Sequence, residues 1–341
     1  LELEPLPPVC ETRGWTLSGR LSGAVVPRLE LGREPVRVGS DGSFSERVSL
    51  ELGANRFELV ATSERGERLT RSLTLWRAPS WWSSQPPDSR APIPLPAGVR
   101  FGGEPELFLN ERDGSELVYV PPMDEGESVD LAGPVRVTRG FFIGRYELTW
   151  ARYFVYCKEE GIAAPRLPEG IEPNHPVSGV SWHEAVRYCR WAGLRLPSEA
   201  EWLYAAGAHE GRRYTWGKGG PPTDWLGNFK DEAGKHHDRF PRTSPVGAFP
   251  DGRSLFGCDD MGGNVFEWLG DGWEKLTKDM KRPLRLDWRG VEGSERRVAR
   301  GGGYDHSYQF SRAIPGAGMR WGDLPERRLA HKGFRVARDA E

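Results

Sequence analysis

The amino-acid sequence has few cysteines, few lysines and no long apolar run. Only 4 of its 341 residues are cysteine, and they form no Cys-x-x-Cys pair, which argues against a disulfide framework and against a zinc site. Only 8 of the 47 basic residues are lysine, and this preference for arginine fits a GC-rich genome and a thermophile. No stretch approaches the ~18 consecutive apolar residues of a membrane-spanning helix. These absences exclude a disulfide-stapled domain and a membrane span within this segment.

The charge of the chain is close to balanced. Its 47 basic and 49 acidic residues give a formal net charge of −2, so bulk positive charge does not favour nucleic-acid binding and we expect no nucleic-acid partner. Hydrophobic residues make up 37% of the chain, with 14 Trp and 14 Phe, which suffices for buried cores. The high content of glycine (43) and proline (28) predicts many turns and loops. At roughly 100–200 residues per domain, the length allows two or three domains.

The N-terminal part, residues 9–77, shows the period-two pattern of β-strands. Apolar residues alternate with polar ones along short stretches, for example at Val48 and Leu50, and turn sequences such as Asp41-Gly42 separate the stretches. Short strands at this spacing predict a small all-β sandwich. The run SDGSFSERVSLELGANRFELV resembles bacterial immunoglobulin-like modules. This resemblance implies a spacer or display module without chemistry of its own.

Prolines are concentrated in the next stretch, residues 78–115, which we predict to be an extended linker. The prolines that support this prediction are Pro79, Pro86, Pro87, Pro92, Pro94 and Pro96. Trp81 and Trp82 lie in the same stretch. Because a bare linker seldom exposes two tryptophans, we expect them to pack on one of the domains.

The last part, residues 116–341, contains three helices that can be placed from their capping residues. The capping residues are Thr149, the box of Ser181 with Glu184, and the box of Ser198 with Glu201. After residue 207 the sequence shows little periodicity of either kind. Bound metal ions are one way in which a domain fixes so much irregular backbone.

Eight sequence blocks of this part occur in a characteristic order. They are ELVYVPP, FFIGRYELT, HPVSGVSWHEAVRYCRWAGLRLPSEAEWLYAA, YTWG, SPVGAFP, DMGGNVFEW, RVARGGGY and GFRVAR. In these blocks the chain resembles the formylglycine-generating enzyme family, also called sulfatase-modifying factors. The resemblance implies an α+β domain with a C-type-lectin-like fold and low regular secondary structure.

The resemblance does not extend to the catalytic thiols of that family. The sulfatase-modifying oxygenase has two cysteines just downstream of an RGGS block, which bind copper and react with the substrate. Here the stretch is RGGGYDHSYQFSRA, and Cys258 is the last cysteine of the chain. Because Asp, His, Ser and Tyr cannot replace a thiolate, we expect no copper, no organic cofactor and no oxygenase activity. Ergothioneine-type iron enzymes of the family take histidines from a preceding helical domain, whereas all seven histidines here lie beyond residue 170.

Two calcium sites of the family are matched by oxygen ligands in this chain. The first set is Asn228, Phe229, Asp238 and Phe240, and the second is Asp260, Gly263, Val265 and Glu267. Hard oxygen ligands on a glycine-rich loop suit Ca²⁺ rather than a transition metal. The alternative is that these carboxylates only cap turns. The pair His236-His237 has no third histidine nearby in the sequence, so we expect a solvated loop there.

Residues 304–332 resemble the variable proteins of diversity-generating retroelements, a second branch of the same fold. In that branch, mutation at adenines randomises asparagine codons of a template. Four blocks contain only residue types that such mutation allows: Asp305, His306, Ser307 and Tyr308; Gly316, Ala317 and Gly318; Gly322, Asp323 and Leu324; Leu329, Ala330 and His331. Arg320 and Trp321, together with Tyr308, are the expected anchors of a ligand. We expect the side chains of the four blocks to face solvent. The alternative is that ordinary sequence drift, rather than mutation at adenines, produced these residues.

The sequence therefore predicts a non-catalytic protein that displays a variable face to a protein or another macromolecule. The alternative is an enzyme of the same family with an altered active site. The chain begins at Leu1 without a methionine, so we expect that an upstream segment was removed, and it could have held a signal peptide or an anchor. We expect a surface-exposed or secreted protein, while a cytoplasmic location stays open.

Overall fold

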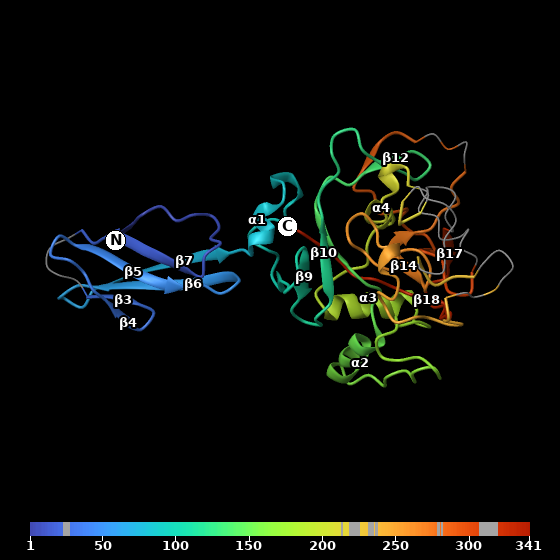
Figure 1. Cartoon of the computed structure of the whole chain (residues 1–341), viewed down its shortest axis with the longest axis horizontal. Coiled ribbons are helices and arrows are strands. Elements are labelled where there is room, and N and C mark those ends of the chain that lie inside the picture. The colour runs from blue at the N-terminus through green and yellow to red at the C-terminus, as the bar shows by residue number, and fades with distance from the viewer. Residues whose placement is uncertain are drawn as a thin grey trace. The chain divides into compact units, whose positions relative to one another are not determined.

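Two compact units, Leu1–Leu95 and Pro96–Glu341, make up the chain in the computed structural model (Figure 1). The structure describes residues 1–22, 28–212, 214–217, 226–230, 235, 238–277, 280, 282–306 and 320–341. Strands predominate and α-helices are few, so the chain is a mixed α/β protein. Among the described residues, no helix combines the length and the apolar character needed to cross a membrane.

Two antiparallel sheets form the first unit. In order, the first sheet contains β1 (Glu2–Leu3), β2 (Gly14–Arg20) and β5 (Ser43–Ser49), and the second contains β4 (Glu34–Val36), β3 (Arg28–Leu31), β6 (Gly53–Thr62) and β7 (Arg68–Arg77). Leu17 and Phe44 from the first sheet and Leu59 from the second are buried in one shared hydrophobic core. The strands predicted from the period-two pattern are confirmed. That the unit is immunoglobulin-like stays a prediction.

The proline-rich stretch after β7 contains two short helices, α1 (Ser80–Ser84) and the 3-10 helix η1 (Pro87–Ser89). The indole N–H of Trp82 donates a hydrogen bond to the carbonyl of Ala91 at 2.9 Å, and the Arg90 guanidinium lies 5.1 Å from the centre of the indole ring. Trp82 therefore packs against this stretch itself.

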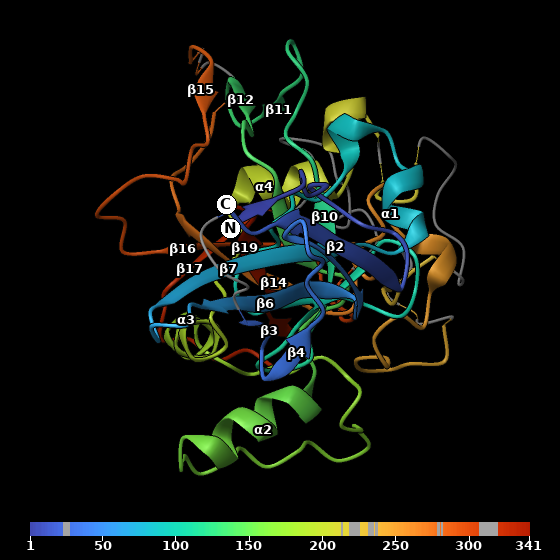
Figure 2. The same cartoon turned by 90° about the vertical axis from the view of Figure 1, so that its left-hand side faces the viewer.

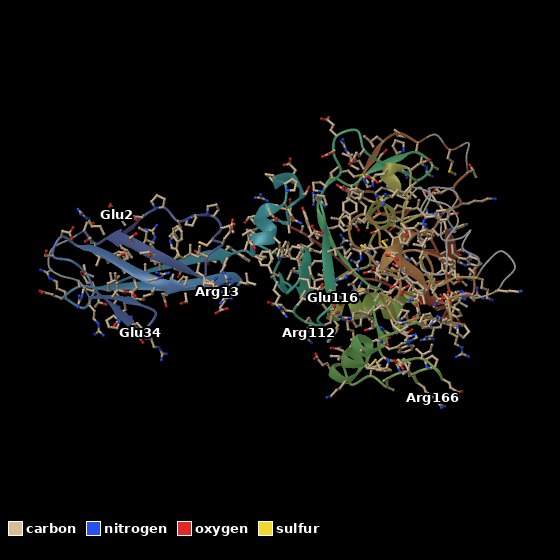
Figure 3. The ribbon with its side chains drawn as sticks, viewed as in Figure 1. Glu2, Arg13, Glu34, Arg112, Glu116 and Arg166 are labelled. Carbon is tan, nitrogen blue, oxygen red and sulfur yellow. The ribbon has the colours of Figure 1, made fainter. Side chains whose placement is uncertain are left out.

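A five-stranded antiparallel sheet begins the second unit. Its order is β19 (Ala337–Asp339), β13 (Phe141–Gly144), β10 (Glu116–Val120), β9 (Leu107–Asn110) and β8 (Val99–Phe101). Strands β8 and β9 lie within residues 78–115, so the predicted linker is too long at its C-terminal end. Arg112 follows β9 (Figure 3). Its guanidinium pairs with Glu159 at 2.9 Å and lies 5.0 Å from the centre of the Trp191 ring. These contacts belong to a folded domain rather than to a linker.

Three α-helices of the second unit begin at the predicted capping residues. They are α2 (Trp150–Glu159), α3 (Trp182–Trp191) and α4 (Glu199–Ala205), visible in Figure 2. Thr149 caps α2, and both predicted capping boxes are present, at α3 and at α4. The helix predictions are confirmed. Two 3-10 helices, η2 (Ala208–Glu210) and η3 (Pro250–Gly252), interrupt the irregular part that follows.

A four-stranded sheet lies at the centre of that irregular part. Its order is β17 (Trp321–Asp323), β16 (Arg297–Arg300), β14 (Phe266–Gly272) and β18 (Lys332–Gly333), with β14 and β18 parallel. A smaller sheet contains β11 (Val129–Asp130), β12 (Pro134–Arg136) and β15 (Arg285–Leu286). Trp202 of α4, Leu269 of β14 and Val298 of β16 share one buried core. In this sheet β14 lies between β16, which precedes the predicted variable stretch, and β18, which begins at the last residue of that stretch.

Candidate functional site

Asp305, His306 and His331 converge beside the four-stranded sheet. Asp305 and His306 lie in the turn after β16, where Gly301 and Gly302 have positive φ angles of 102° and 84°. Such angles favour glycine, which explains the glycine-rich block at this position. His331 immediately precedes β18. The structure thus brings together three predicted site residues from two segments that are distant in sequence.

Backbone hydrogen bonds hold this cluster in place. The N–H of Tyr304 donates to the carbonyl of Asn264 at 2.8 Å, and the N–H of Lys230 donates to the carbonyl of His306 at 2.9 Å. The N–H of Phe266 at the start of β14 donates to the carbonyl of His331, also at 2.8 Å. Both segments are therefore fixed to the loop and strand around residues 264–266.

The Asp305 carboxylate lies between the two imidazoles. Oδ1 is 2.7 Å from Nδ1 of His306, and Oδ2 is 2.9 Å from Nδ1 of His331. Burial alone would raise the pKa of Asp305, but the hydrogen bonds and charges of the two histidines hold that pKa well below its usual range. The three side chains are half-buried, so the cluster can be reached from solvent.

Aromatic and aliphatic side chains surround the cluster. The buried ring of Phe266 lies 5.0 Å from the His306 ring and 5.8 Å from the His331 ring. The indole of Trp321 lies 6.4 Å from the His306 ring and is 39% exposed. Leu324, just beyond β17, is exposed as well. The cluster and Trp321 form a partly exposed face, hereafter the Asp305 face, which comprises Asp305, His306, Trp321 and His331.

Arg320, predicted to anchor a ligand, is instead part of a buried ion pair. Its Nε donates to both carboxylate oxygens of Glu199, at 2.7 and 2.9 Å, and its side chain is only 11% exposed. A further N–H donates to the carbonyl of Glu274. This ion pair leaves Arg320 little exposed surface for a ligand, and sequence spacing does not reveal the distant Glu199. That Arg320 contacts a ligand stays a prediction.

The block Gly322–Leu324 is also largely structural. Asp323 forms an ion pair with Lys332 at 3.0 Å, and both side chains are only 1% exposed. A Cβ atom added at Gly322 would lie 2.3 Å from the ring of Trp273, so no larger residue fits without displacing that ring. The expectation that Gly322 and Asp323 face solvent is therefore wrong, and only Leu324 of this block is exposed.

The other predicted residues of the variable stretch divide into two groups. Leu329 is half-buried and Ala330 is exposed, and both lie in the loop between β17 and β18. Five further residues lie outside the described part of the chain: Ser307, Tyr308, Gly316, Ala317 and Gly318.

Comparison with known proteins identifies the second unit. The family described as "Sulfatase-modifying factor enzyme 1-like domain" matches residues 112–340. The chain belongs to this family. A formylglycine-generating enzyme of Streptomyces coelicolor is 39% identical over 284 residues, which cover 67% of this chain and 88% of that enzyme. The corresponding enzyme of Thermomonospora curvata is 40% identical over 191 residues, which cover 51% of this chain and 61% of the enzyme. For this second relative, the chain thus spans less than two thirds of its length.

Solved structures are also similar to the chain. PvdO from Pseudomonas aeruginosa has a TM-score of 0.58 and 26% identity, and the similarity covers 70% of this chain and 100% of PvdO. Treponema denticola variable protein 1 has a TM-score of 0.48 and 20% identity, covering 71% of this chain and 98% of that protein.

All four thiols of this family member are buried. They belong to Cys10, Cys157, Cys189 and Cys258. Burial raises the pKa of every one of them, to about 11 for Cys258. A protonated and enclosed thiol is a poor nucleophile and a poor metal ligand.

The first predicted calcium set contains a buried oxygen without a hydrogen bond. Oδ1 of Asn228 accepts none from any described residue, although Nδ2 of the same amide donates to the carbonyl of Arg242 at 2.7 Å. The Asp238 carboxylate accepts the backbone N–H of Phe229 at 3.2 Å and that of Phe240 at 2.9 Å. An unsatisfied buried oxygen is costly, and a Ca²⁺ ion would satisfy it. These residues therefore fit the ion, although Asp238 also caps turns.

The second predicted calcium set fits only in part. Oδ1 of Asp260 is buried without a hydrogen bond from the described residues, and burial raises the pKa of this carboxyl to about 7. Glu267, in contrast, accepts hydrogen bonds from Arg335 at 2.7 and 2.8 Å and from the Trp202 indole at 2.8 Å. The charge of Glu267 is thus neutralised by a residue far downstream, and that Glu267 binds calcium stays a prediction. Gly263 has a φ angle of 103°, and Val265 is buried.

Sequence reasoning missed Glu147, which lies beside this second set. Its carboxylate accepts the side-chain amide of Asn264 at 2.7 Å and the backbone N–H of Val265 at 3.0 Å. Burial and the nearby carboxylates of Asp260 and Glu267 raise the pKa of Glu147 well above its usual value. The block FFIGRYELT contains Glu147, but nothing in its spacing predicts that the side chain is buried.

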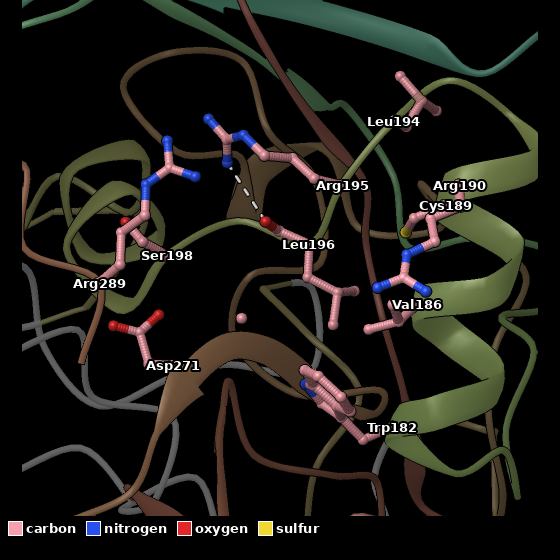
Figure 4. Close-up of a pocket in the computed structure, with 11 residues that line it drawn as sticks. Trp182, Val186, Cys189, Arg190, Leu194, Arg195, Leu196, Ser198, Asp271 and Arg289 are labelled. Carbon is pink, nitrogen blue, oxygen red and sulfur yellow. Dashed lines mark hydrogen bonds between the residues drawn. The ribbon is translucent and has the colours of Figure 1, made fainter. Parts of the chain in front are cut away.

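Sequence reasoning also missed a cavity of about 240 Å³ between α3 and the end of β14 (Figure 4). Trp182, Val186 and Leu196 form its apolar side, while Asp271 and Arg289 lie on its polar side. Oδ1 of Asp271 is buried without a hydrogen bond from the described residues, and burial raises the pKa of this carboxyl. The cavity could hold a small molecule with one apolar and one polar end.

Proposed function

We propose that this protein is a non-catalytic member of the sulfatase-modifying factor family that binds a macromolecular ligand through the Asp305 face. One observation carries the proposal: partly exposed acidic, imidazole and indole groups follow the Gly-rich block, where the family's oxygenase has its reactive thiols. The chain has no cysteine after Cys258, and that thiol is buried with a raised pKa. The chain therefore has no residue at this position that could perform thiolate chemistry.

The chemistry of the Asp305 face suits recognition. Trp321 offers a large apolar surface at a small cost in conformational entropy, and Asp305, His306 and His331 offer charge and hydrogen bonds. A rigid sheet beneath the face would keep these groups in place when a ligand binds. We expect the ligand to be a protein or another macromolecule.

We further propose that the face is varied by a diversity-generating retroelement. The residues that can then vary without a packing cost include Asp305, His306, Leu324, Ala330 and His331, which are half-buried or exposed. Gly322 and Asp323 are excluded by their packing against Trp273 and Lys332. Sequencing of the gene's surroundings tests this origin: a reverse-transcriptase gene and a near-copy of codons 295–338 are expected. Their absence from the complete genome would contradict it.

Calcium would have a structural role in this proposal. Asn228 and Asp238, with neighbouring backbone carbonyls, would hold one ion, and Asp260 would contribute to a second. An ion at either place cross-links irregular loops and binds only the folded state, so it adds to stability.

The absence of catalysis is tested with a peptide that carries a sulfatase-type cysteine. After aerobic incubation with the full chain and copper, the peptide should keep its mass. Native protein should also fail to react with a thiol reagent, because all four cysteines are buried. Formylglycine above the level of a no-protein control would overturn the proposal.

Ligand binding is tested by screening the full chain against an array of purified surface proteins and polysaccharides. A ligand of the face should bind the wild type and lose at least about tenfold in affinity with Trp321→Ala, since hot-spot tryptophans contribute 2 kcal/mol or more. Leu286→Ala removes an exposed side chain of β15 and should leave the affinity unchanged. Equal binding by all three proteins would show that the Asp305 face is not the binding surface.

A second candidate function, an enzyme of the same family with an altered site, is favoured by the convergence of one carboxylate and two imidazoles. Such a set of side chains binds metal ions in many enzymes. Whether it does so here can be measured separately from ligand binding.

A further inference from the structure

We propose that Asp305, His306 and His331 form a binding site for a divalent transition-metal ion. Each side chain offers one donor atom, and these three atoms all lie within 4.8 Å of one another. In the part of the chain that the structure describes, no other group of three or more such side chains converges in this way. The inference goes beyond the proposed function, because it requires no macromolecular ligand.

The donor set determines the kind of metal. Two imidazole nitrogens and one carboxylate oxygen suit Zn²⁺, Fe²⁺, Co²⁺ or Ni²⁺, whereas Ca²⁺ prefers oxygen ligands only. Three protein ligands leave further coordination positions open to water or to a small ligand. The site therefore differs in chemistry from both predicted calcium sets. It also differs from a copper site of two thiolates, because it contains no cysteine.

The site is preorganised. The hydrogen bonds of Asp305 to His306 and His331, at 2.7 and 2.9 Å, already place the Nδ1 atoms on the two oxygens of one carboxylate. The carbonyl of His331 is bound to the N–H of Phe266, and that of His306 to the N–H of Lys230. A metal ion would take the place of the protons shared between the carboxylate and the imidazoles, so binding releases protons and strengthens with rising pH.

The surroundings fit a metal ion with an open position. The Phe266 ring shields one side of both imidazoles, at 5.0 and 5.8 Å. In the ion pairs that the structure describes for Asp305, its only partners are the two histidines, with no Arg or Lys to compete with a cation. The exposed Trp321 indole stands 6.4 Å from the His306 ring, so a small ligand on the metal would contact it.

Metal titration of the full chain, without a polyhistidine tag, tests the inference. Cobalt(II) is added in the presence of excess calcium, which saturates sites made of oxygen ligands, and binding is followed by the visible absorption of the metal. We expect one Co²⁺ per chain, and zinc(II) should displace it. Asp305→Asn and His331→Asn should each weaken binding at least about tenfold. The double variant His236→Asn/His237→Asn removes two histidines that are consecutive in the sequence and lie outside the described residues, and it should bind like the wild type.

Several outcomes would overturn the inference. They are no binding by the wild type, unchanged binding by the Asp305 and His331 variants, or loss of binding in the His236/His237 double variant. If a variant fails to fold, modification of the wild type by diethyl pyrocarbonate decides instead. Zinc(II) should protect His306 and His331 at least about tenfold from the reagent, while the exposed His183 is modified equally with and without metal. If zinc(II) left the modification of His306 and His331 unchanged, as it should for His183, the site would be refuted.

Discussion

Arg320 donates two hydrogen bonds from one nitrogen to the carboxylate of Glu199, which is completely buried. Arg300 binds the same carboxylate at 2.6 and 2.8 Å. One buried acid therefore joins the residue before β17 to the end of β16. A position that the sequence favours for ligand contact thus belongs to the structural framework of the domain.

Replacing Arg320 should destabilise the protein. In Arg320→Ala the buried carboxylate keeps only Arg300, and we expect the free energy of unfolding to fall by about 2 kcal/mol. Chemical denaturation measures this change. The control Arg327→Ala removes an exposed cation that lies 3.3 Å from Asp323 and should cost no more than about 0.5 kcal/mol. Similar losses in both variants would contradict the structural role of Arg320.

Gly322 should not tolerate a side chain. Gly322→Ala places a methyl group against the Trp273 ring, and such overpacking typically costs about 1–3 kcal/mol. Gly103→Ala is the matched control, because a Cβ atom at Gly103 meets nothing within 4 Å, and its effect should stay within about 0.5 kcal/mol. Thermal unfolding of both variants measures the difference. If Gly322→Ala melted at the wild-type temperature, this position would accept a side chain and would again be a candidate for the variable face.

The stability of the domain should depend on Glu184 at acid pH. Burial alone would raise the pKa of Glu184, but hydrogen bonds from Arg328 and Ser181 lower it to about 2, from an ordinary value of 4.5. The stabilisation from the charged carboxylate is therefore complete above pH 4.5 and is lost as the pH falls towards 2.

Glu184→Gln removes this contribution. The melting temperature of the variant should lie below that of the wild type at pH 6, and the difference should shrink between pH 4.5 and pH 2. Glu160→Gln, an exposed position at the end of α2, should show no such trend. If the difference in melting temperature stayed constant with pH, the charge of Glu184 would not contribute to stability.

Removing calcium should destabilise the second unit. A chelator should lower the melting temperature of the wild type, because the ion binds only the native state. The shift should be much smaller in Asp238→Asn, which has lost one charged ligand. Asp251→Asn, an exposed acid of η3, should respond like the wild type. Equal shifts in all three proteins, or none, would remove Asp238 from the set of ligands.

Local signals in the sequence predicted much of the fold. The capping boxes at Ser181 and Ser198 act within four residues of chain, so α3 and α4 could be placed in advance. The strands of the first unit followed from alternation alone. The ordered sequence blocks gave the family, and with it the fold of the second unit.

Partners distant in sequence could not be predicted. Arg320 with Glu199, Asp323 with Lys332 and Glu267 with Arg335 are buried ion pairs whose existence depends on the complete fold. The convergence of His331 on Asp305 was missed for the same reason, because 26 positions separate them.

The Asp323–Lys332 pair closes the loop formed by residues 324–331. Both ends of the loop are anchored inside the protein, and the Lys332 ammonium also lies 4.1 Å from the centre of the Trp268 ring. Exposed residues of this loop, such as Glu326, Arg327 and Ala330, could therefore be exchanged while β17 and β18 keep their places in the sheet. For the design of a binding scaffold, the Asp323 carboxylate and the Lys332 ammonium group mark the two ends between which the loop can be varied.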